Sequence, residues 1–159
     1  MDTSKTTSRK ARPAALRLLV FLLGFLGLNA LVAGAAFIIA PGGHLLQLPS
    51  SYLAPSPFKD FLLPGILLFT FIGVYPAVIG YSLWSLPEWS WPEGINPFKG
   101  SHWSWAGSLA AGIAAIVWII VQVQWLAFGA LHGIVLAWGG LILILTLLPG
   151  VRRYCARKA

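Results

Sequence analysis

Residues 105–148 contain no Asp, Glu, Lys or Arg, and this uncharged stretch limits what the chain can fold into. As one straight helix, its 44 residues would extend about 66 Å. The hydrocarbon core of a bilayer is only about 30 Å thick. The stretch therefore predicts two membrane-spanning helices joined by a tight turn near residues 125–129.

The rest of the chain is similarly apolar. Hydrophobic residues make up 58% of the 159 residues and charged residues 9%, whereas a soluble domain has about 25% charged residues. We expect a membrane domain over residues 15–149, with basic tails at 1–14 and 150–159. The predicted fold is an all-α, antiparallel four-transmembrane-helix bundle, with spans at about 15–40, 60–84, 104–124 and 130–148.

The net charge of +7 has an uneven distribution. Basic residues close to a span anchor it on the cytoplasmic side and attract anionic lipid. Both termini are therefore predicted to be cytoplasmic, in a bacterial inner membrane, and no nucleic-acid partner is expected. Nine of the eleven Lys and Arg residues lie in or beside the two tails: Lys5, Arg9, Lys10, Arg12, Arg17, Arg152, Arg153, Arg157 and Lys158.

Two features compete with this topology. A basic start, an apolar run and the small residues 33–35 also resemble a signal peptide. Because the apolar run continues through residues 37–39, we expect the first span to be retained. The second connection, residues 85–104, would face the cytoplasm although it carries two Glu and one Lys, and acidic residues count little in the orientation rule.

Small residues are expected to mark the contacts between spans, because lipid gives no hydrophobic drive between membrane helices. Pro76 should interrupt the second span and free the carbonyl of Ile72, and Ser56 should begin that span as its N-cap. The predicted contact stripes are Gly27, Ala30 and Gly34; Gly65, Gly73 and Ala77; Ser104, Ser108, Gly112 and Ala115; and Gly129, Gly133, Ala137 and Gly140.

No charged residue lies deep in any span, whereas ion pumps and proton relays usually need one. The sequence has no HExxH or GxSxG motif and no paired carboxylates. Its single cysteine, Cys155, excludes an internal disulfide and a thiolate metal site within one chain. We therefore expect no enzyme activity, no metal and no cofactor.

A few polar residues remain as candidate ligand contacts. Gln122 and His132 lie on the two arms of the predicted hairpin, where they would form an interhelical hydrogen bond of about 0.6–2 kcal/mol or the polar floor of a ligand pocket. Asn29 would join two helices or line a pocket. Asp60 would cap the second span or contact an external ligand.

Tryptophan is concentrated around the second connection. This pattern is typical of an aromatic belt at the headgroup level. The alternative is a docking surface for a partner subunit or lipid. Five of the eight Trp residues belong to this cluster, namely Trp84, Trp89, Trp91, Trp103 and Trp105.

Two motifs carry a resemblance to a known group. They are PF-x-D-x-x-x-PG at residues 57–65 and W-I-x-V-Q at residues 118–122. Together with the order of spans, they resemble a widespread group of small, uncharacterised bacterial four-span membrane proteins. The resemblance implies topology and a bacterial origin but no activity.

Three functions follow from these features. We expect a non-enzymatic accessory, assembly or scaffold component, which packs against another membrane protein or a second copy. The first alternative is a binder or carrier of a neutral or amphipathic small molecule, such as lipid or quinone, near Gln122, His132 and Asn29. The second is an intramembrane enzyme that uses His132 with Asp60.

Overall fold

The computed structural model describes residues 11–157, and the helices in this range follow the predicted spans. Residues 1–10 and 158–159 lie outside the described residues, and with them Lys5, Arg9, Lys10 and Lys158 of the predicted tails. The described chain contains one isolated β-bridge and no strand. Four helical stretches are long and apolar enough to cross a membrane: Ala14–Ile39, Leu62–Ser85, Trp103–Gln122 and Ala130–Leu147.

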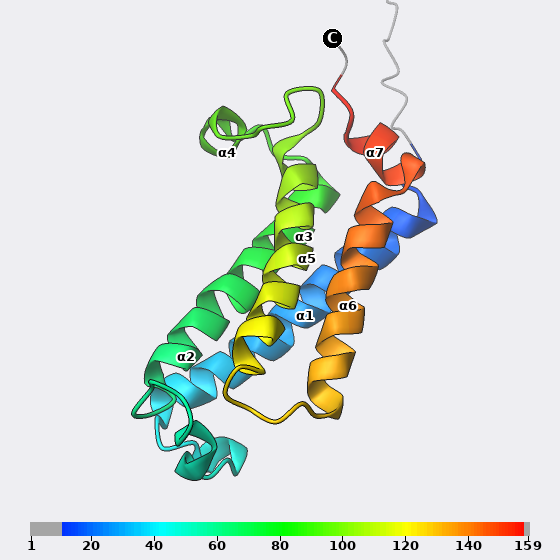
Figure 1. Ribbon diagram of the computed structural model, residues 1–159. Coiled ribbons are helices and arrows are strands. Elements are labelled where there is room, and N and C mark those ends of the chain that lie inside the picture. Colours follow the sequence, from blue (N-terminus) through cyan, green and yellow to red (C-terminus); the bar gives the residue numbers. More distant parts are fainter. Residues whose placement is uncertain (1–10, 158–159) are drawn as a thin grey trace, which may run out of the picture.

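The four spans form an antiparallel bundle, as predicted (Figure 1). The first span, α1 (Ala14–Ile39), packs along the second, which consists of α2 (Leu62–Leu67), η3 (Leu68–Val74) and α3 (Tyr75–Ser85). The third, α5 (Trp103–Gln122), packs on the second and the fourth, and the fourth, α6 (Ala130–Leu147), returns to α1. The chain is therefore a multi-pass membrane protein.

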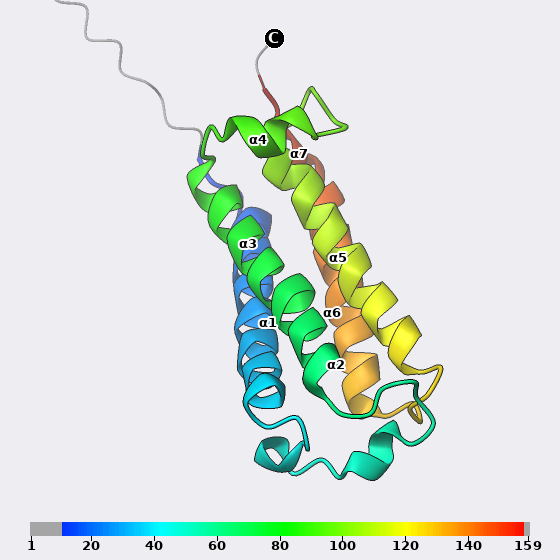
Figure 2. The same cartoon turned by 90° about the vertical axis from the view of Figure 1, so that its left-hand side faces the viewer.

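Short helices lie at the two ends of the bundle (Figure 2). The 3-10 turns η1 (His44–Leu46) and η2 (Ser50–Leu53) belong to the first connection. At the opposite end lie α4 (Ser90–Gly94) and α7 (Pro149–Cys155), of which α7 contacts α1. We call this opposite end, residues 85–104 with residues 149–157, the cap.

The second span is interrupted as Pro76 predicts, although by a change of helix type. Residues Leu68–Val74 form a π-helix, and the amide of Tyr75 donates to the carbonyl of Thr70. Pro76 then lies in the first turn of α3, where its missing N–H is tolerated. The predicted N-cap of this span was wrong: α2 begins at Leu62, so Ser56 lies before the helix.

Glycine sets the distance between the first two spans, as the small-residue stripes predict. A Cβ atom added at Gly27 would lie 2.9 Å from the carbonyl oxygen of Gly73. One added at Gly34 would lie 2.8 Å from the backbone nitrogen of Phe69. The two backbones are therefore in direct contact.

The stripe predicted for the fourth span was wrong. A Cβ atom added at Gly139 would lie 3.0 Å from the carbonyl oxygen of Gly112, so Gly139 makes the contact with α5. The predicted residues Gly133, Ala137 and Gly140 lie on another side of α6, where a Cβ atom added at Gly133 would meet only the ring of Phe128, at 3.8 Å. Ala137 is exposed, and no atom lies within 4 Å of a Cβ atom added at Gly140.

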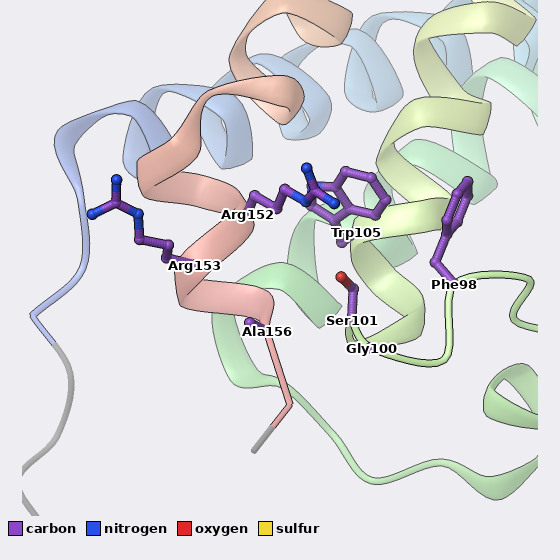
Figure 3. A pocket seen from close by; sticks show the side chains of 7 residues that line it. All are labelled: Phe98, Gly100, Ser101, Trp105, Arg152, Arg153 and Ala156. Atoms are coloured by element: carbon purple, nitrogen blue, oxygen red, sulfur yellow. The ribbon is translucent and has the colours of Figure 1, made fainter. Parts of the chain in front are cut away.

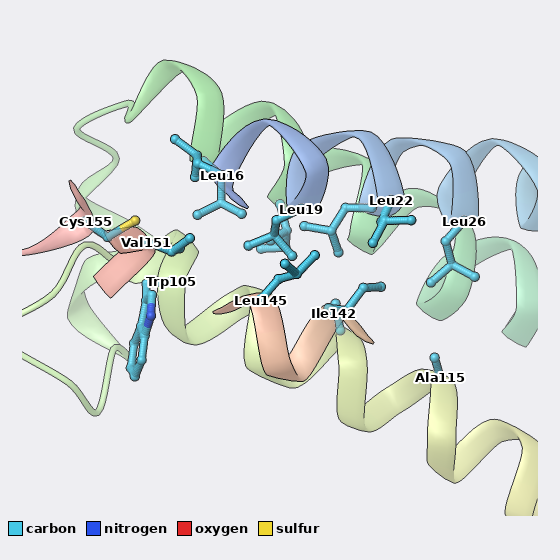
Figure 4. Packing of buried hydrophobic residues seen from close by; sticks show 14 of the residues in the cluster. Leu16, Leu19, Leu22, Leu26, Trp105, Ala115, Ile142, Leu145, Val151 and Cys155 are labelled. Atoms are coloured by element: carbon cyan, nitrogen blue, oxygen red, sulfur yellow. The ribbon is translucent and has the colours of Figure 1, made fainter. Parts of the chain in front are cut away.

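The core lies mainly in the half of the bundle next to the cap (Figure 4). Leu16, Leu19 and Leu23 of α1 are fully buried there, together with Ile142 of α6 and Val151 of α7. In the other half, residues 130–138 of α6 include no fully buried residue. The fourth span is therefore well packed at one end only.

Candidate functional site

The structure does not join Gln122 and His132. Gln122 is half-buried at the end of α5, and within the described chain its side chain makes no hydrogen bond to His132. The His132 Nδ1 atom accepts from the backbone N–H of Gly129 over 3.0 Å, which caps the start of its own helix. Its ring also stacks on Phe128.

The other two candidate ligand residues are also apart. Asn29 is exposed on α1, and its Nδ2 donates to the carbonyl of Phe25 one turn earlier. Asp60 is exposed, and its Oδ1 accepts from the backbone N–H of Leu62 over 2.9 Å. Each side chain thus binds its own segment of backbone, and the four residues form no shared pocket among the described residues.

The tryptophan cluster divides into exposed and buried members. Trp84, Trp89 and Trp91 are exposed, Trp91 most of all at 77%. The interface role predicted for Trp103 and Trp105 does not fit their positions, because they are 6% and 5% exposed. Their indole N–H groups donate within the protein, and such donors usually find a partner when they are buried.

The buried pair instead makes two internal bonds, one between two spans and one within the cap. Trp105 Nε1 donates to the carbonyl of Thr146 over 2.9 Å, from the start of α5 to the end of α6. Trp103 Nε1 donates to the carbonyl of Pro87 over 3.3 Å. Among the exposed members, Trp84 makes a cation–π contact with Arg12, whose guanidinium carbon lies 3.8 Å from the ring centroid.

His102 lies at the centre of the cap and is 6% exposed. Its Nδ1 accepts from the backbone N–H of Ser104, so it is the N-cap of α5. Since that nitrogen is an acceptor, the proton of the neutral ring is on Nε2, which donates to the carbonyl of Pro87 over 3.0 Å. Burial lowers the pKa of His102, whereas its bond to Pro87 and the nearby Glu93 oppose this shift.

Asn96 holds the turn that precedes His102. It is buried, and its Nδ2 donates to the carbonyl of Ser101 over 2.8 Å and to Oε1 of Glu93 over 3.0 Å. Its Oδ1 accepts from the backbone N–H of Phe98 over 3.0 Å. The amide therefore replaces a regular hydrogen-bond ladder in this loop.

The C-terminal segment closes the cap. The backbone N–H of His102 donates to the carbonyl of Cys155, and the N–H of Arg157 donates to the carbonyl of Gly100. Ser101 and Ala156 form the antiparallel bridge between these bonds. The Arg157 guanidinium lies 3.3 Å from the Glu93 carboxylate. The predicted basic tail is thus folded through residue 157.

Two cavities open at the cap. The larger, about 420 Å³, is lined by Glu88, Trp89, Ser90, Glu93 and Arg157. The other, about 400 Å³, lies between α7 and the loop before α5 (Figure 3). It is lined by Phe98, Gly100, Ser101, Trp105, Arg152, Arg153 and Ala156.

Sequence reasoning did not find the cap as a structured unit. Two stretches could have indicated it. One is SHWSW at residues 101–105, where aromatic and small polar residues are interspersed, and the other is PGVRRYC at residues 149–155, which can form a helix after the fourth span. The described residues contain no group of three or more His, Cys, Asp or Glu side chains that could hold a metal ion. The polar groups at the cap are hydrogen-bonding side chains and the arginines Arg152, Arg153 and Arg157.

Comparison with known proteins adds no family. No protein-family model matches the chain, and no curated protein and no solved structure matches it. The four-span architecture that the resemblance implied is confirmed by the fold. The bacterial origin stays a prediction.

Proposed function

We propose that this chain is a non-enzymatic accessory or assembly component of a complex in a bacterial cytoplasmic membrane, with both termini in the cytoplasm. Its docking surface is the outward face of α6, defined by Gly133, Ala137 and Gly140, which receives a transmembrane helix of a partner protein or of a second copy. The observation that carries this proposal is that this small-residue face is open.

The open face has the spacing of a helix contact. Its three residues follow one another at intervals of four and three, which places them on one side of a helix. Small residues at such positions allow two backbones to approach closely in lipid. Within this protein, Gly112 and Gly139 already make such a contact between α5 and α6.

The surroundings of the open face are apolar. Ile134 and Ile144 of α6 are both more than half exposed. A neighbouring helix would therefore gain dispersion contacts along the whole span, without having to satisfy a charged group. The weak burial of residues 130–138 leaves room for that neighbour.

The small-molecule carrier has less support. Gln122, His132 and Asn29 do not converge, and both cavities described above lie at the cap. A carrier usually surrounds most of its ligand in one largely preformed pocket.

Purification from native membranes in mild detergent, followed by native mass spectrometry, tests the proposal. We expect the wild-type chain to retain a stoichiometric protein partner or a defined second copy. Gly140→Leu should remove it, because the added side chain occupies the open face. The control is Gly24→Leu on α1, where a Cβ atom likewise meets nothing within 4 Å.

Two outcomes would contradict the proposal. One is a bare monomer or a monomer that carries a small molecule, the latter being the result expected of a carrier. The other is an equal loss of partner in both variants, which would show that any added bulk disturbs the complex.

A further inference from the structure

We propose that the cavity between α7 and the loop at residues 98–101 binds the phosphate-bearing headgroup of an acidic phospholipid. We call it the headgroup cavity. Its location in the bundle, its arginine and its unpaired hydroxyl carry this inference independently of the α6 face.

Arg152 supplies the cationic group. Among the described residues its guanidinium has no hydrogen bond, ion pair or ring contact, and its side chain reaches toward Trp105 (Figure 3). A guanidinium presents five N–H donors in a planar fork that fits two oxygens of a phosphate. An anion in the headgroup cavity would therefore satisfy donors that the protein leaves open.

Ser101 supplies a second polar group. It is only 8% exposed, yet its hydroxyl makes no hydrogen bond to any other described residue. Figure 3 shows the hydroxyl oxygen of Ser101 on the cavity side of the loop. The hydroxyl is therefore open to the cavity, where it can donate a hydrogen bond to a phosphate or glycerol oxygen of a lipid.

The depth of the headgroup cavity fits a lipid headgroup. The third span begins at Trp103 and the fourth ends at Leu147, so the cavity lies where the spans leave the hydrocarbon. Trp105 and Phe98 form its apolar wall and contact each other edge to face. Leu147 and Leu148, at the end of the fourth span, are exposed apolar residues.

The volume of about 400 Å³ also fits. Ligand pockets occupy about 300–1,000 Å³. A second arginine, Arg153, lines the same space and adds to the positive field. Anionic lipid is attracted to such clusters of basic residues beside a span. The same chemistry would also accept free inorganic phosphate, and the experiment separates these two sources.

The test uses the full-length protein in detergent, with binding followed by native mass spectrometry. Dioleoyl phosphatidylglycerol is titrated against dioleoyl phosphatidylcholine, and then against inorganic phosphate as a competitor. We expect selective retention of phosphatidylglycerol. Arg152→Gln should weaken it about tenfold, equivalent to about 1.4 kcal/mol, and Ser101→Ala by a smaller factor.

The control is Arg17→Gln, which removes another exposed arginine from the same end of the bundle. A built site predicts that Arg17→Gln leaves phosphatidylglycerol binding within twofold of wild type. Wild-type elution volume and thermal stability of Arg152→Gln would show that the loss does not come from unfolding. Arg152→Lys, which keeps the charge but not the planar fork, should restore binding only in part.

Three results would overturn the proposal of a lipid headgroup site. They are equal losses in Arg152→Gln and Arg17→Gln, equal retention of the two lipids, and full displacement of phosphatidylglycerol by millimolar phosphate. The first two would show non-specific attraction of lipid, and the third would assign the cavity to a soluble anion.

Discussion

The backbone N–H of His102 donates to the carbonyl oxygen of Cys155 over 2.8 Å. This bond connects the start of the third span to the end of the chain. With Trp105 bonded to the carbonyl of Thr146, the start of α5 is fixed to both α6 and α7. The cap is therefore a folded part of the protein and holds two spans in register.

Helix contact through glycine predicts the effect of a single methyl group. Gly34→Ala should destabilise the protein by about 1–3 kcal/mol, because the new Cβ atom would lie 2.8 Å from the Phe69 backbone. Gly24→Ala on the same helix meets open space and should be neutral or slightly stabilising. Thermal unfolding of both purified variants checks this difference, and equal melting temperatures would contradict the close contact.

Because Trp105 is buried and Trp91 is exposed, replacing each by Phe should change the stability of the protein differently. Trp105→Phe loses the buried indole bond to Thr146 and should cost about 1 kcal/mol. Trp91→Phe, at a residue that is 77% exposed, should leave stability unchanged. Unfolding by a denaturing detergent measures both, and a larger loss from Trp91→Phe would mean that the cap is packed differently.

His102 predicts a pH-dependent cap. Its pKa is lowered from the ordinary 6.5 by burial, so the folded cap favours the neutral ring. The corresponding stability is fully present above pH 6.5 and is lost as the pH falls through the lowered folded pKa. Protonation at Nδ1 would also remove the acceptor for Ser104.

Hydrogen exchange of the amides of His102 and Arg157 measures this effect. We expect the free energy of opening to fall between pH 7 and pH 5 in the wild type. His102→Asn keeps an N-cap acceptor without titrating in this range, so its opening should not change with pH. An equal change in that variant would assign the effect to another group.

Orientation is tested best away from the native cysteine. Cys155 is 2% exposed, so an added reagent would not reach it from either side. In a Cys155→Ala background, Ser51→Cys and Ser90→Cys place thiols at exposed residues of the two opposite ends. We expect an impermeant maleimide to label residue 51 in intact cells and residue 90 only after lysis. The reverse pattern would place both termini outside.

Hydropathy and length were sufficient to predict the spans, because two are separate long apolar runs and the uncharged stretch 105–148 is too long for one membrane crossing. The helix ends lie within two residues of the predicted ones. On α1 the predicted contacts at Gly27 and Gly34 are present, although Gly24 of the same helix meets open space. On α6, glycine and alanine lie on more than one side of the helix, and only the position of α5 selects Gly139.

The cap depends on contacts that local sequence does not specify. In the sequence, Asn96 and His102 are typical loop residues. Their structural roles depend on the C-terminal segment, which pairs with residues 100–102. The basic composition of the C-terminal tail also predicts an exposed segment, so the burial of Val151 and Cys155 could not be predicted from it. The headgroup cavity forms only when these two segments meet.

The most direct test of the docking face is photo-crosslinking in native membranes. A benzophenone side chain at Ile144, beside Gly140 on α6, is compared with one at Ile120 on α5, since both residues are about half exposed or more. The proposal predicts a discrete crosslinked polypeptide from residue 144 and none from residue 120. Lipid adducts alone from both residues would contradict a protein partner on this face.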